Sequence, residues 1–341
     1  MITSITALSI IGSCSNPSEK ERIQAIKDGI EIKQPNTIIS YSKYIDVQDL
    51  KTHLYKYASE EFQGRATGTV GQKKATKYLR DYYLNEQICS PLGEGNYYQN
   101  IPKSYLGEAY NDSENVLAFI EGSEKPEEVV VLTAHLDHEG IDEKGNVYYG
   151  ADDDGSGTVA LLEIAQAFKK AENMGLGPKR TILFLHTTAE EIGLYGSHYY
   201  TENPIFPLYN TVVNLNVDMI GRTDRLHSNN DSYLYLIGSD RLSKELHYIS
   251  EAINNELFNI DLDYRFNDEN DHNNYYSRSD HYHFAKYDIP VIFYFNGEHE
   301  DYHQITDTPD KINYTLLEKR SRLIFATAWQ LANQDERVML D

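Results

Sequence analysis

From about residue 115 onward, short runs of β-branched and aromatic residues alternate with longer segments of helical spacing. The expected strands are VLAFIEG, EEVVVLTA, RTILFLHT, TVVNLNV, YLYLIG and PVIFYFNG, and the expected helices are TVALLEIAQAFKKA, SKELHYISEAINNEL and NYTLLEKRSRLIFATAWQLAN. Such an alternation predicts an α/β fold with a mixed, mostly parallel β-sheet sandwiched by helices. Because 40% of the 341 residues are hydrophobic, the chain can bury one large core without disulfides. We therefore expect a single domain over residues 41–341.

The first residues differ in composition from the rest of the chain. Residues 2–14, ITSITALSIIGSC, are apolar and small, and they are too few to cross a bilayer, which takes about 20 residues. Their end, Ile11-Gly12-Ser13-Cys14, resembles a bacterial lipobox, in which the cysteine becomes lipidated. Residues 1–14 are therefore predicted to be a signal peptide with a lipobox. The protein would be exported, to the bacterial periplasm or as an outer-membrane lipoprotein, and would contact the membrane only through Cys14.

The alternative for the apolar run is a plain N-terminal strand or helix, because no lysine or arginine precedes it. Residues 15–40 are polar and have no clear period, so we expect a linker there.

The charge balance is strongly acidic. Lysine and arginine number 31 against 53 aspartate and glutamate residues, which gives a formal net charge of −22. Since a surface of this sign repels phosphate groups, nucleic acid is not expected as a partner.

Five potential metal ligands lie in short polar motifs at the ends of apolar runs. The motifs are TAHLDHEG, GADDDGSG, TTAEEIGLYGS, LNVDMIG and DYHQITDTPDKI, and the residues are His135, Asp153, Glu191, Asp218 and His303. Loops beyond the carboxyl ends of strands form the ligand crevice of open α/β sheets, so the five side chains can converge. One such motif alone is usually solvated surface, but their joint occurrence favours a two-metal hydrolase.

The donor types favour zinc. Two histidine nitrogens with several carboxylates suit Zn²⁺ or a similar first-row ion better than Ca²⁺ or Mg²⁺. A bridging carboxylate can hold two cations about 3.5–4 Å apart, so that one polarises a carbonyl while both acidify a shared water. Because Glu190 and Glu191 are adjacent, one can bind metal while the other accepts the proton of the water as general base. Asp137 can accept the ring N–H of His135 and fix its tautomer.

Other polar residues near these motifs are expected to have structural roles. Histidines expected to be structural, or to orient a neighbouring group, are His138, His186, His281 and His283. The turn Gly155-Ser156-Gly157 lacks a Walker lysine and a full GxGxxG pattern. It is expected to let the backbone turn from Asp153 into the next helix rather than to bind phosphate.

The combination of HLD, GADDDGSG, AEEIGLYGS, VDMIG and YHQITDTPDKI resembles a known family. It is similar to the di-zinc aminopeptidases of the secreted bacterial leucyl aminopeptidase type, the aminopeptidase Y family of metallopeptidase clan MH. The resemblance covers roughly residues 55–335. Two further segments resemble these enzymes, GRATGTVG and SDHYHF, and Asp280 and His281 of the latter are read as shaping the site rather than binding metal. The short stretch between Leu84 and Val116 leaves no room for the protease-associated domain that some relatives insert.

The resemblance implies a ligand set. His135 and Asp218 would bind one zinc ion, and Glu191 and His303 would bind the other. Asp153, the middle acid of its triplet, would bridge the two, giving two Zn²⁺ per chain.

The resemblance also implies catalytic roles and an activity. Glu190 would be the general base, and Tyr302 would hydrogen-bond the oxyanion of the tetrahedral intermediate. The implied enzyme is a metallo-aminopeptidase, a zinc exopeptidase that removes N-terminal residues from peptides with free N-termini.

Two alternatives remain open on the same fold. Glutaminyl cyclases have one zinc and catalyse no net hydrolysis, and the intact HLD, DDD and EEIGLYGS motifs resemble the peptidases more closely. A catalytically inactive binding domain would be marked by the loss of a ligand, and none of the five is missing.

Overall fold

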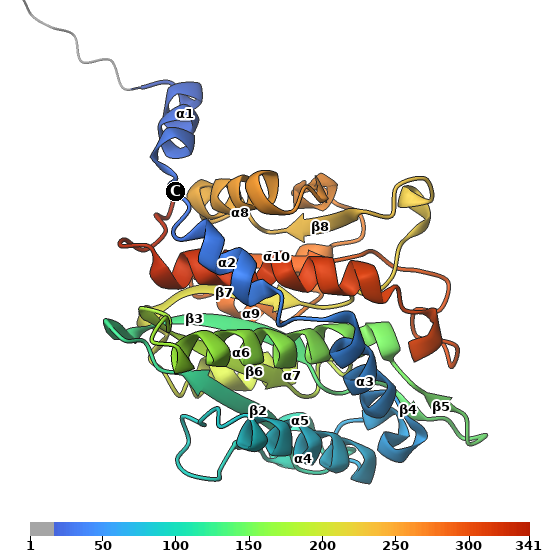
Figure 1. Cartoon of the computed structure of the whole chain (residues 1–341). Coiled ribbons are helices and arrows are strands. Elements are labelled where there is room, and N and C mark those ends of the chain that lie inside the picture. Colours follow the sequence, from blue (N-terminus) through green and yellow to red (C-terminus); the bar gives the residue numbers. More distant parts are fainter. Residues whose placement is uncertain (1–16) are drawn as a thin grey trace, which may run out of the picture.

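An eight-stranded β-sheet runs through the centre of the computed structural model, which describes residues 17–341 (Figure 1). Its strands are β1 (Tyr98–Ile101), β2 (Ser113–Ile120), β3 (Lys125–His135), β6 (Arg180–Thr187), β7 (Thr211–Val217), β8 (Tyr233–Ile237), β9 (Asp261–Asp263) and β10 (Val291–Phe295). The order across the sheet is β1-β2-β6-β3-β7-β10-β8-β9. The central strands β6, β3, β7 and β10 are mutually parallel, and antiparallel pairs join β1 to β2, β2 to β6 and β8 to β10. The predicted α/β class with a mixed, mostly parallel sheet is confirmed.

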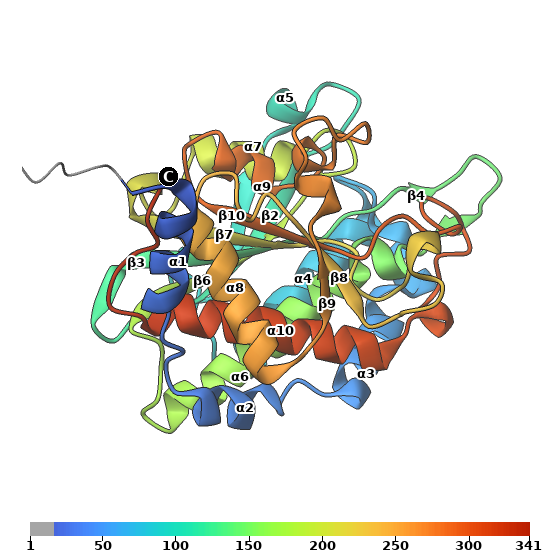
Figure 2. The same cartoon turned by 90° about the horizontal axis from the view of Figure 1, so that it is seen from above.

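Helices cover both faces of this sheet. They are α1 (Glu19–Gly29), α2 (Pro35–Ser42), α3 (Val47–Tyr57), α4 (Val70–Asn85), α5 (Lys103–Leu106), α6 (Gly157–Asn173), α7 (Tyr195–Glu202), α8 (Lys244–Leu257), α9 (His281–Ala285) and α10 (Tyr314–Asn333). Figure 2 shows α6, α8 and α10 on one side of the sheet and α5, α7 and α9 on the other. Within residues 17–341, no helix combines the length and apolarity that crossing a bilayer requires.

The apolar strands are explained by this double cover. Along β3, Val130, Leu132 and Ala134 point into the large core beneath α6 and α10, whereas Val129 and Val131 point into a smaller core on the other face. Every residue of β6 and of β7 is buried. A parallel strand that is covered on both sides has no polar face, so its sequence reads as a continuous apolar run.

Short irregular segments connect the main elements and carry most of the polar motifs. They are the turns η1 (Glu60–Arg65), η2 (Ala151–Ser156), η3 (Leu208–Asn210), η4 (Arg225–His227), η5 (Arg265–Asn267), η6 (Tyr275–Ser277) and η7 (Pro309–Lys311), and a hairpin of β4 (Gly140–Ile141) and β5 (Val147–Tyr148). The hairpin projects from the body of the protein (Figure 2).

The segment expected to be a linker, residues 15–40, differs from that expectation over its described part, which contains helix α1 and most of α2. Helix α1 begins with a capping box, in which Ser18 and Glu21 satisfy each other's backbone N–H groups, and none of its residues is buried. Helix α2 buries Ile38 and stacks Tyr41 on Trp329 of α10. A short polar helix that is stabilised by its N-cap shows no apolar period, so its composition alone predicted a linker. The predicted lipobox with Cys14 lies outside the described residues.

Candidate metal centre

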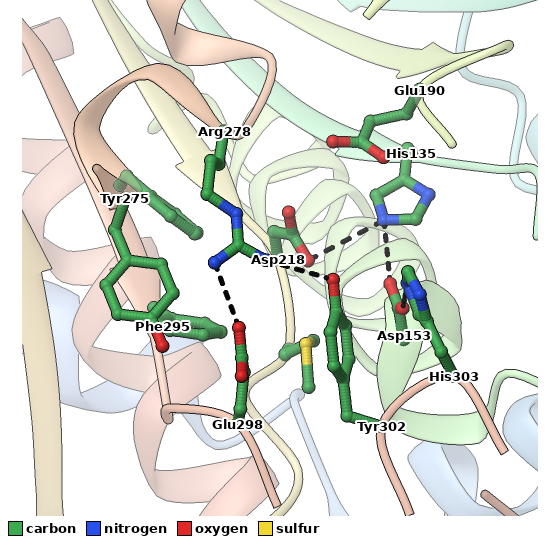
Figure 3. Close-up of a pocket in the computed structure, with 12 residues that line it drawn as sticks. His135, Asp153, Glu190, Asp218, Tyr275, Arg278, Phe295, Glu298, Tyr302 and His303 are labelled. Atoms are coloured by element: carbon green, nitrogen blue, oxygen red, sulfur yellow. Dashed lines mark hydrogen bonds and ion pairs between the residues drawn. The ribbon is translucent and has the colours of Figure 1, made fainter. Parts of the chain in front are cut away.

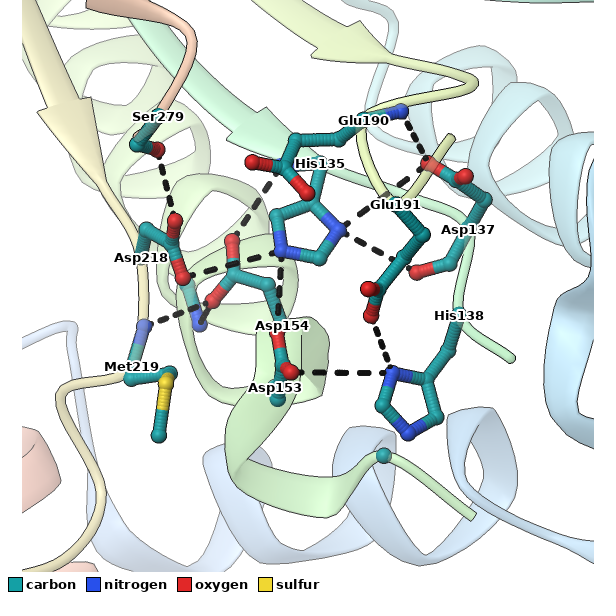
Figure 4. A network of polar contacts seen from close by, with 12 residues as sticks. His135, Asp137, His138, Asp153, Asp154, Glu190, Glu191, Asp218, Met219 and Ser279 are labelled. Carbon is teal, nitrogen blue, oxygen red and sulfur yellow. Dashed lines mark hydrogen bonds and ion pairs between the residues drawn. The ribbon is translucent and has the colours of Figure 1, made fainter. Parts of the chain in front are cut away.

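The five expected ligands meet beside the carboxyl ends of the parallel strands; Figure 4 shows His135, Asp153, Glu191 and Asp218, and Figure 3 shows His303 beside Asp153. His135 is the last residue of β3, Glu191 follows β6, and Asp218 follows β7. Asp153 lies in η2, just before α6, and His303 lies in the loop between β10 and α10. Two of the groups that the structure brings within metal-binding distance share Asp153.

The first group joins His135, Asp153 and Asp218. Nε2 of His135 lies 3.0 Å from Oδ1 of Asp153 and 3.6 Å from Oδ1 of Asp218. Nδ1 of the same ring lies 3.2 Å from the backbone carbonyl oxygen of Asp137. Because a carbonyl oxygen only accepts hydrogen bonds, this contact places the hydrogen on Nδ1 and leaves the lone pair of Nε2 facing the two carboxylates.

The second group joins His138, Asp153 and Glu191, and His303 lies against the same two carboxylates. Nε2 of His303 lies 3.1 Å from Oδ2 of Asp153 and 3.2 Å from Oε2 of Glu191. Oδ2 of Asp153 is buried and makes no hydrogen bond. Nδ1 of His303 lies 3.3 Å from Glu139, whose carboxylate thereby orients the ring. Asp153 therefore offers one oxygen to each group.

The spacing of these atoms fits zinc. Ligand atoms on one tetrahedral Zn²⁺, at bond lengths of about 2.1 Å, lie about 3.4 Å apart. The separations within the two groups run from 3.0 to 3.6 Å. Each group offers one imidazole nitrogen and two carboxylate oxygens, which is a donor set that first-row ions accept and Ca²⁺ disfavours.

The three consecutive acids Asp152, Asp153 and Asp154 make different contacts. The carboxylate of Asp307 accepts the backbone N–H groups of Asp152, at 2.9 Å, and of Asp153, at 3.1 Å. Asp154 accepts the N–H of Met219 at 3.1 Å. The carboxylate of Asp152 accepts the N–H of Gly221 at 2.7 Å. Because the carboxylates of Asp152 and Asp154 are thus turned toward backbone donors, only the middle acid faces the metal centre. The TDTPDKI motif thus contributes Asp307 as the anchor of the loop.

The SDHYHF segment contacts residues of the site. Oγ of Ser279 donates to Oδ2 of Asp218 at 2.6 Å. Asp280 is fully buried and accepts a hydrogen bond from Thr187, and the ring of His281 stacks on a phenylalanine of β10. Neither Asp280 nor His281 belongs to a described group of potential ligands.

Two residues of the HLDHEG motif make contacts that differ from the sequence reading. The carboxylate of Asp137 lies 3.9 Å from Nδ1 of His135 and instead accepts the N–H of Glu190 at 3.2 Å and the hydroxyl of Thr67 at 2.9 Å. The backbone carbonyl of Asp137 thus fixes the tautomer of His135. The side chain of Asp137 instead positions the loop that carries Glu190. His138, expected to be structural, places Nδ1 2.6 Å from Oε1 of Glu191.

Two other histidines that were expected to be structural pack against neighbouring side chains. His186 is buried and shares a hydrogen bond with the hydroxyl of Tyr83, and His283 stacks on His198.

A pocket of about 340 Å³ opens beside the first group (Figure 3). Its lining residues outside the five ligands are Glu190, Met219, Tyr275, Arg278, Phe293, Phe295, Glu298 and Tyr302. Figure 3 shows the carboxylate of Glu190 beside the ring of His135 and the guanidinium of Arg278 between Glu298 and Tyr302. Arg278 lies 3.0 Å from Glu298 and 3.4 Å from the hydroxyl of Tyr302. Burial raises the pKa of Glu190 well above its usual range and raises the pKa of Tyr302.

Three residues at the site have a left-handed backbone. Ala189, Met219 and His303 are non-glycine residues with φ values of 57°, 58° and 54°, in the left-handed region. Each such residue costs on the order of 1–3 kcal/mol, and such residues cluster at functional sites. They lie directly before Glu190, directly after Asp218, and at the expected ligand itself, so the turns aim these three side chains.

Sequence reasoning missed the supporting residues Glu139, Arg278, Glu298 and Asp307. Glu139 and Asp307 lie inside motifs that were singled out, and Arg278 directly precedes SDHYHF. Their proximity to the motifs was the available signal, but only the folded loops show which atoms they contact.

Comparison with known proteins identifies the family of the chain. The model of "Peptidase family M28" matches residues 115–328, more than half of the chain. The glutamate carboxypeptidase 2 homolog of Caenorhabditis elegans is 28% identical over 219 residues, 62% of this chain and 25% of that protein. The chain spans about a quarter or less of the length of the curated relatives that match it first.

Solved structures share the fold. The LapA aminopeptidase of Legionella pneumophila matches with a TM-score of 0.70 and 21% identity, over 97% of this chain and 81% of that one. A glutaminyl cyclase of Bacteroides thetaiotaomicron matches with a TM-score of 0.63 and 18% identity, over 84% and 98%. At these identities the structures show the fold alone, whereas the family match spans all five motifs that hold the expected ligands. The resemblance seen in the sequence is confirmed at this level, and the chain belongs to peptidase family M28.

Proposed function

We propose that this protein is a zinc aminopeptidase that uses two metal ions to hydrolyse the first peptide bond of its substrates. The observation that carries the proposal is the position of Asp153, whose two oxygens face separate donor groups beside a pocket that Glu190 and Tyr302 line. His135 and Asp218 would hold one ion, and Glu191 and His303 the other.

The residues around this centre can perform the hydrolysis. Two zinc ions supply a water of lowered pKa and polarise the scissile carbonyl. Glu190 lines the pocket beside His135, and its raised pKa suits a group that takes the proton from the water and passes it to the leaving amine. The hydroxyl of Tyr302 donates a hydrogen bond to the oxyanion, and Arg278 holds that hydroxyl and adds positive charge.

The pocket favours a chain terminus over an internal peptide segment. Tyr275, Phe295 and the Arg278–Glu298 pair form its walls, which suit the binding of a single terminal side chain. Carboxylates of Asp218, Glu190 and Glu298 line it. A positively charged α-ammonium group is the terminus that this charge stabilises, and its binding aligns the first peptide bond.

Features of the site distinguish the proposed function from three alternative functions. A glutaminyl cyclase has one zinc, whereas Asp153 here serves two groups. An inactive binding domain would lack a ligand, whereas all five expected residues are present and converge. A carboxypeptidase, as some relatives are named, needs a cation free to bind the terminal carboxylate, whereas Arg278 is paired with Glu298.

The test uses one peptide with a free N-terminus, its N-acetylated form and its form with N-terminal glutamine. The free peptide is expected to lose single residues in order from its amino end, and the acetylated peptide to stay intact. Mass spectrometry of timed samples measures both. Release of residues from the carboxyl end, or internal cleavage of the acetylated peptide, would contradict the proposal. Formation of pyroglutamate without shortening would establish a cyclase.

A further inference from the structure

A second and larger hollow adjoins the metal centre on the side of Glu191. It measures about 1050 Å³ and is open to solvent, and its walls include Glu191 and His138. The remaining walls come from three segments that are far apart in the chain: Ala66, Thr67 and Thr69; Ala109, Tyr110 and Asn111; and Glu139, Ile141, Asp142 and Tyr148 around the β4–β5 hairpin. We call this hollow the hairpin groove.

The two hollows adjoin different parts of the candidate metal centre. The smaller pocket is lined by His135 and Asp218 of the first group, by Asp153 and His303, and by the expected catalytic residues Glu190 and Tyr302. The hairpin groove contains Glu191, of the second group. An exopeptidase that acts on the amino end needs a closed space for one residue and an open path for the rest of the chain. The difference in volume assigns the first role to the pocket and the second to the groove.

The groove is acidic. Its ionisable walls besides His138 and Glu191 are Glu139 and Asp142, and the described residues that line it include no lysine or arginine. Asp142 stays ionised, because N–H groups of Lys144 and Asn146 hydrogen-bond to its carboxylate and lower its pKa. Lys144 sits in the hairpin turn outside the groove.

The groove also offers apolar and hydrogen-bonding surface. The side chain of Ile141 is 46% exposed beside the rings of Tyr110 and Tyr148, and Thr67, Thr69 and Asn111 carry polar groups nearby. Aliphatic stems of long side chains can lie on such surface while their charged ends reach the carboxylates.

We propose that the hairpin groove receives the peptide that follows the scissile bond, and that it favours lysine or arginine at the first or second position after that bond. This inference rests on the proposed aminopeptidase activity and adds a substrate class to it. The strongly negative net charge of the chain, −22, attracts the same peptides from a distance.

The test compares three amidated peptides, Leu-Lys-Ala, Leu-Gln-Ala and Leu-Glu-Ala, with a leucine anilide reporter that is too short to fill the groove. The zinc-loaded full chain should hydrolyse the lysine peptide with kcat/KM about fivefold above that of the glutamate peptide, the span of one exposed ion pair. The preference should shrink at high salt, because the groove is open to solvent.

Matched variants at Ile141 isolate the groove from the chemistry, because this side chain projects from the hairpin and contacts no expected ligand. Ile141→Lys should reverse the preference between the lysine and glutamate peptides, whereas Ile141→Gln should preserve it. The ratio of the two peptide rates within each variant is the readout, because a change in the overall rate divides out of it.

The outcomes separate the two proposals. Equal rates on the three peptides at low salt, or an unchanged ratio in Ile141→Lys, would overturn the groove assignment while hydrolysis of the reporter leaves the aminopeptidase intact. A reporter that is not hydrolysed at all would contradict the proposed function and the inference with it.

Discussion

Glu190 and Glu191 are neighbours in the chain but face different surroundings. Glu191 lies 3.2 Å from His303 and 2.6 Å from His138, within a group of potential ligands. Glu190 lines the pocket and belongs to none of the described groups. The left-handed backbone at Ala189 sets this division, because it turns the chain directly before the pair.

This division predicts different losses for the two glutamines. Glu190→Gln should retain zinc and lose activity by a factor of roughly 10² to 10⁴, the usual contribution of a positioned general base. Glu191→Gln should lose both zinc and activity, because it removes a ligand. Metal analysis and peptide hydrolysis on the same samples measure both effects. Exchanged phenotypes would reverse the assignment.

The pair Arg278 and Tyr302 predicts a coupled effect on turnover. Tyr302→Phe should lower kcat by about 10²-fold, as the loss of an oxyanion donor does, with little change in KM. Arg278→Met should lower kcat by about tenfold, the value of one hydrogen bond to a charged group.

The double variant tests whether Arg278 acts through Tyr302. Removing the arginine should cost much less in Tyr302→Phe than in the wild type, because the hydroxyl that it holds is already absent. Independent, multiplying losses would show that Arg278 does not position the hydroxyl.

At the scale of elements, strand β6 carries a buried histidine against helix α4. Burial lowers the pKa of His186 to about 3, from an ordinary value of 6.5, and the hydroxyl of Tyr83 contacts Nε2 of its ring. Since the folded-state pKa is the lower one, the unfolded chain binds the proton first as the pH falls below 6.5. The stability that neutral His186 permits is therefore complete above pH 6.5 and is lost progressively toward pH 3.

His186→Gln should remove this part of the acid sensitivity, because glutamine does not titrate and its carbonyl still accepts from Tyr83. Between about pH 7 and about pH 5, the free energy of unfolding should fall by about 2 kcal/mol more in the wild type than in the variant. Urea unfolding of both metal-free proteins at the two pH values measures the difference. Parallel pH profiles would show that His186 is not buried as a neutral ring.

The elements were predictable to different degrees. Strands β6 and β7 have the predicted bounds, and α6, α8 and α10 lie within a few residues of them, because each combines length with a strong apolar pattern. The three-residue strand β9 and the short helix α9 have too few residues to show a period. Helix α1 was missed because its stability at the N-terminus comes from a capping box.

For the site, the sequence predicted three of the expected ligands, His135, Glu191 and Asp218, at strand ends, and the structure brings them together with Asp153 and His303. Atom-level contacts could not be predicted, because they depend on how separate loops pack. The side chain of Asp137 contacts Glu190 rather than the ring of His135, and Glu139 contacts His303 across the site.

At the scale of the whole molecule, the metal centre joins segments from most of the chain. Its expected ligands come from the ends of β3, β6 and β7, from the start of α6 and from the loop before α10. Ions that bind only the folded arrangement stabilise it against unfolding by mass action. Metal binding at this centre would therefore stabilise the packing of these segments against one another. The proposed export and the lipid anchor at Cys14 stay predictions.

The measurement that tests the central claim most directly is the zinc content of purified protein with Asp153 intact and with Asp153→Asn. The account predicts two zinc ions per chain in the wild type and in the exposed control Glu143→Gln. It predicts that both ions are lost or weakened together in Asp153→Asn, because one carboxylate serves both groups. A single tight ion in the wild type, or one ion retained at full affinity in Asp153→Asn, would contradict the shared two-metal centre.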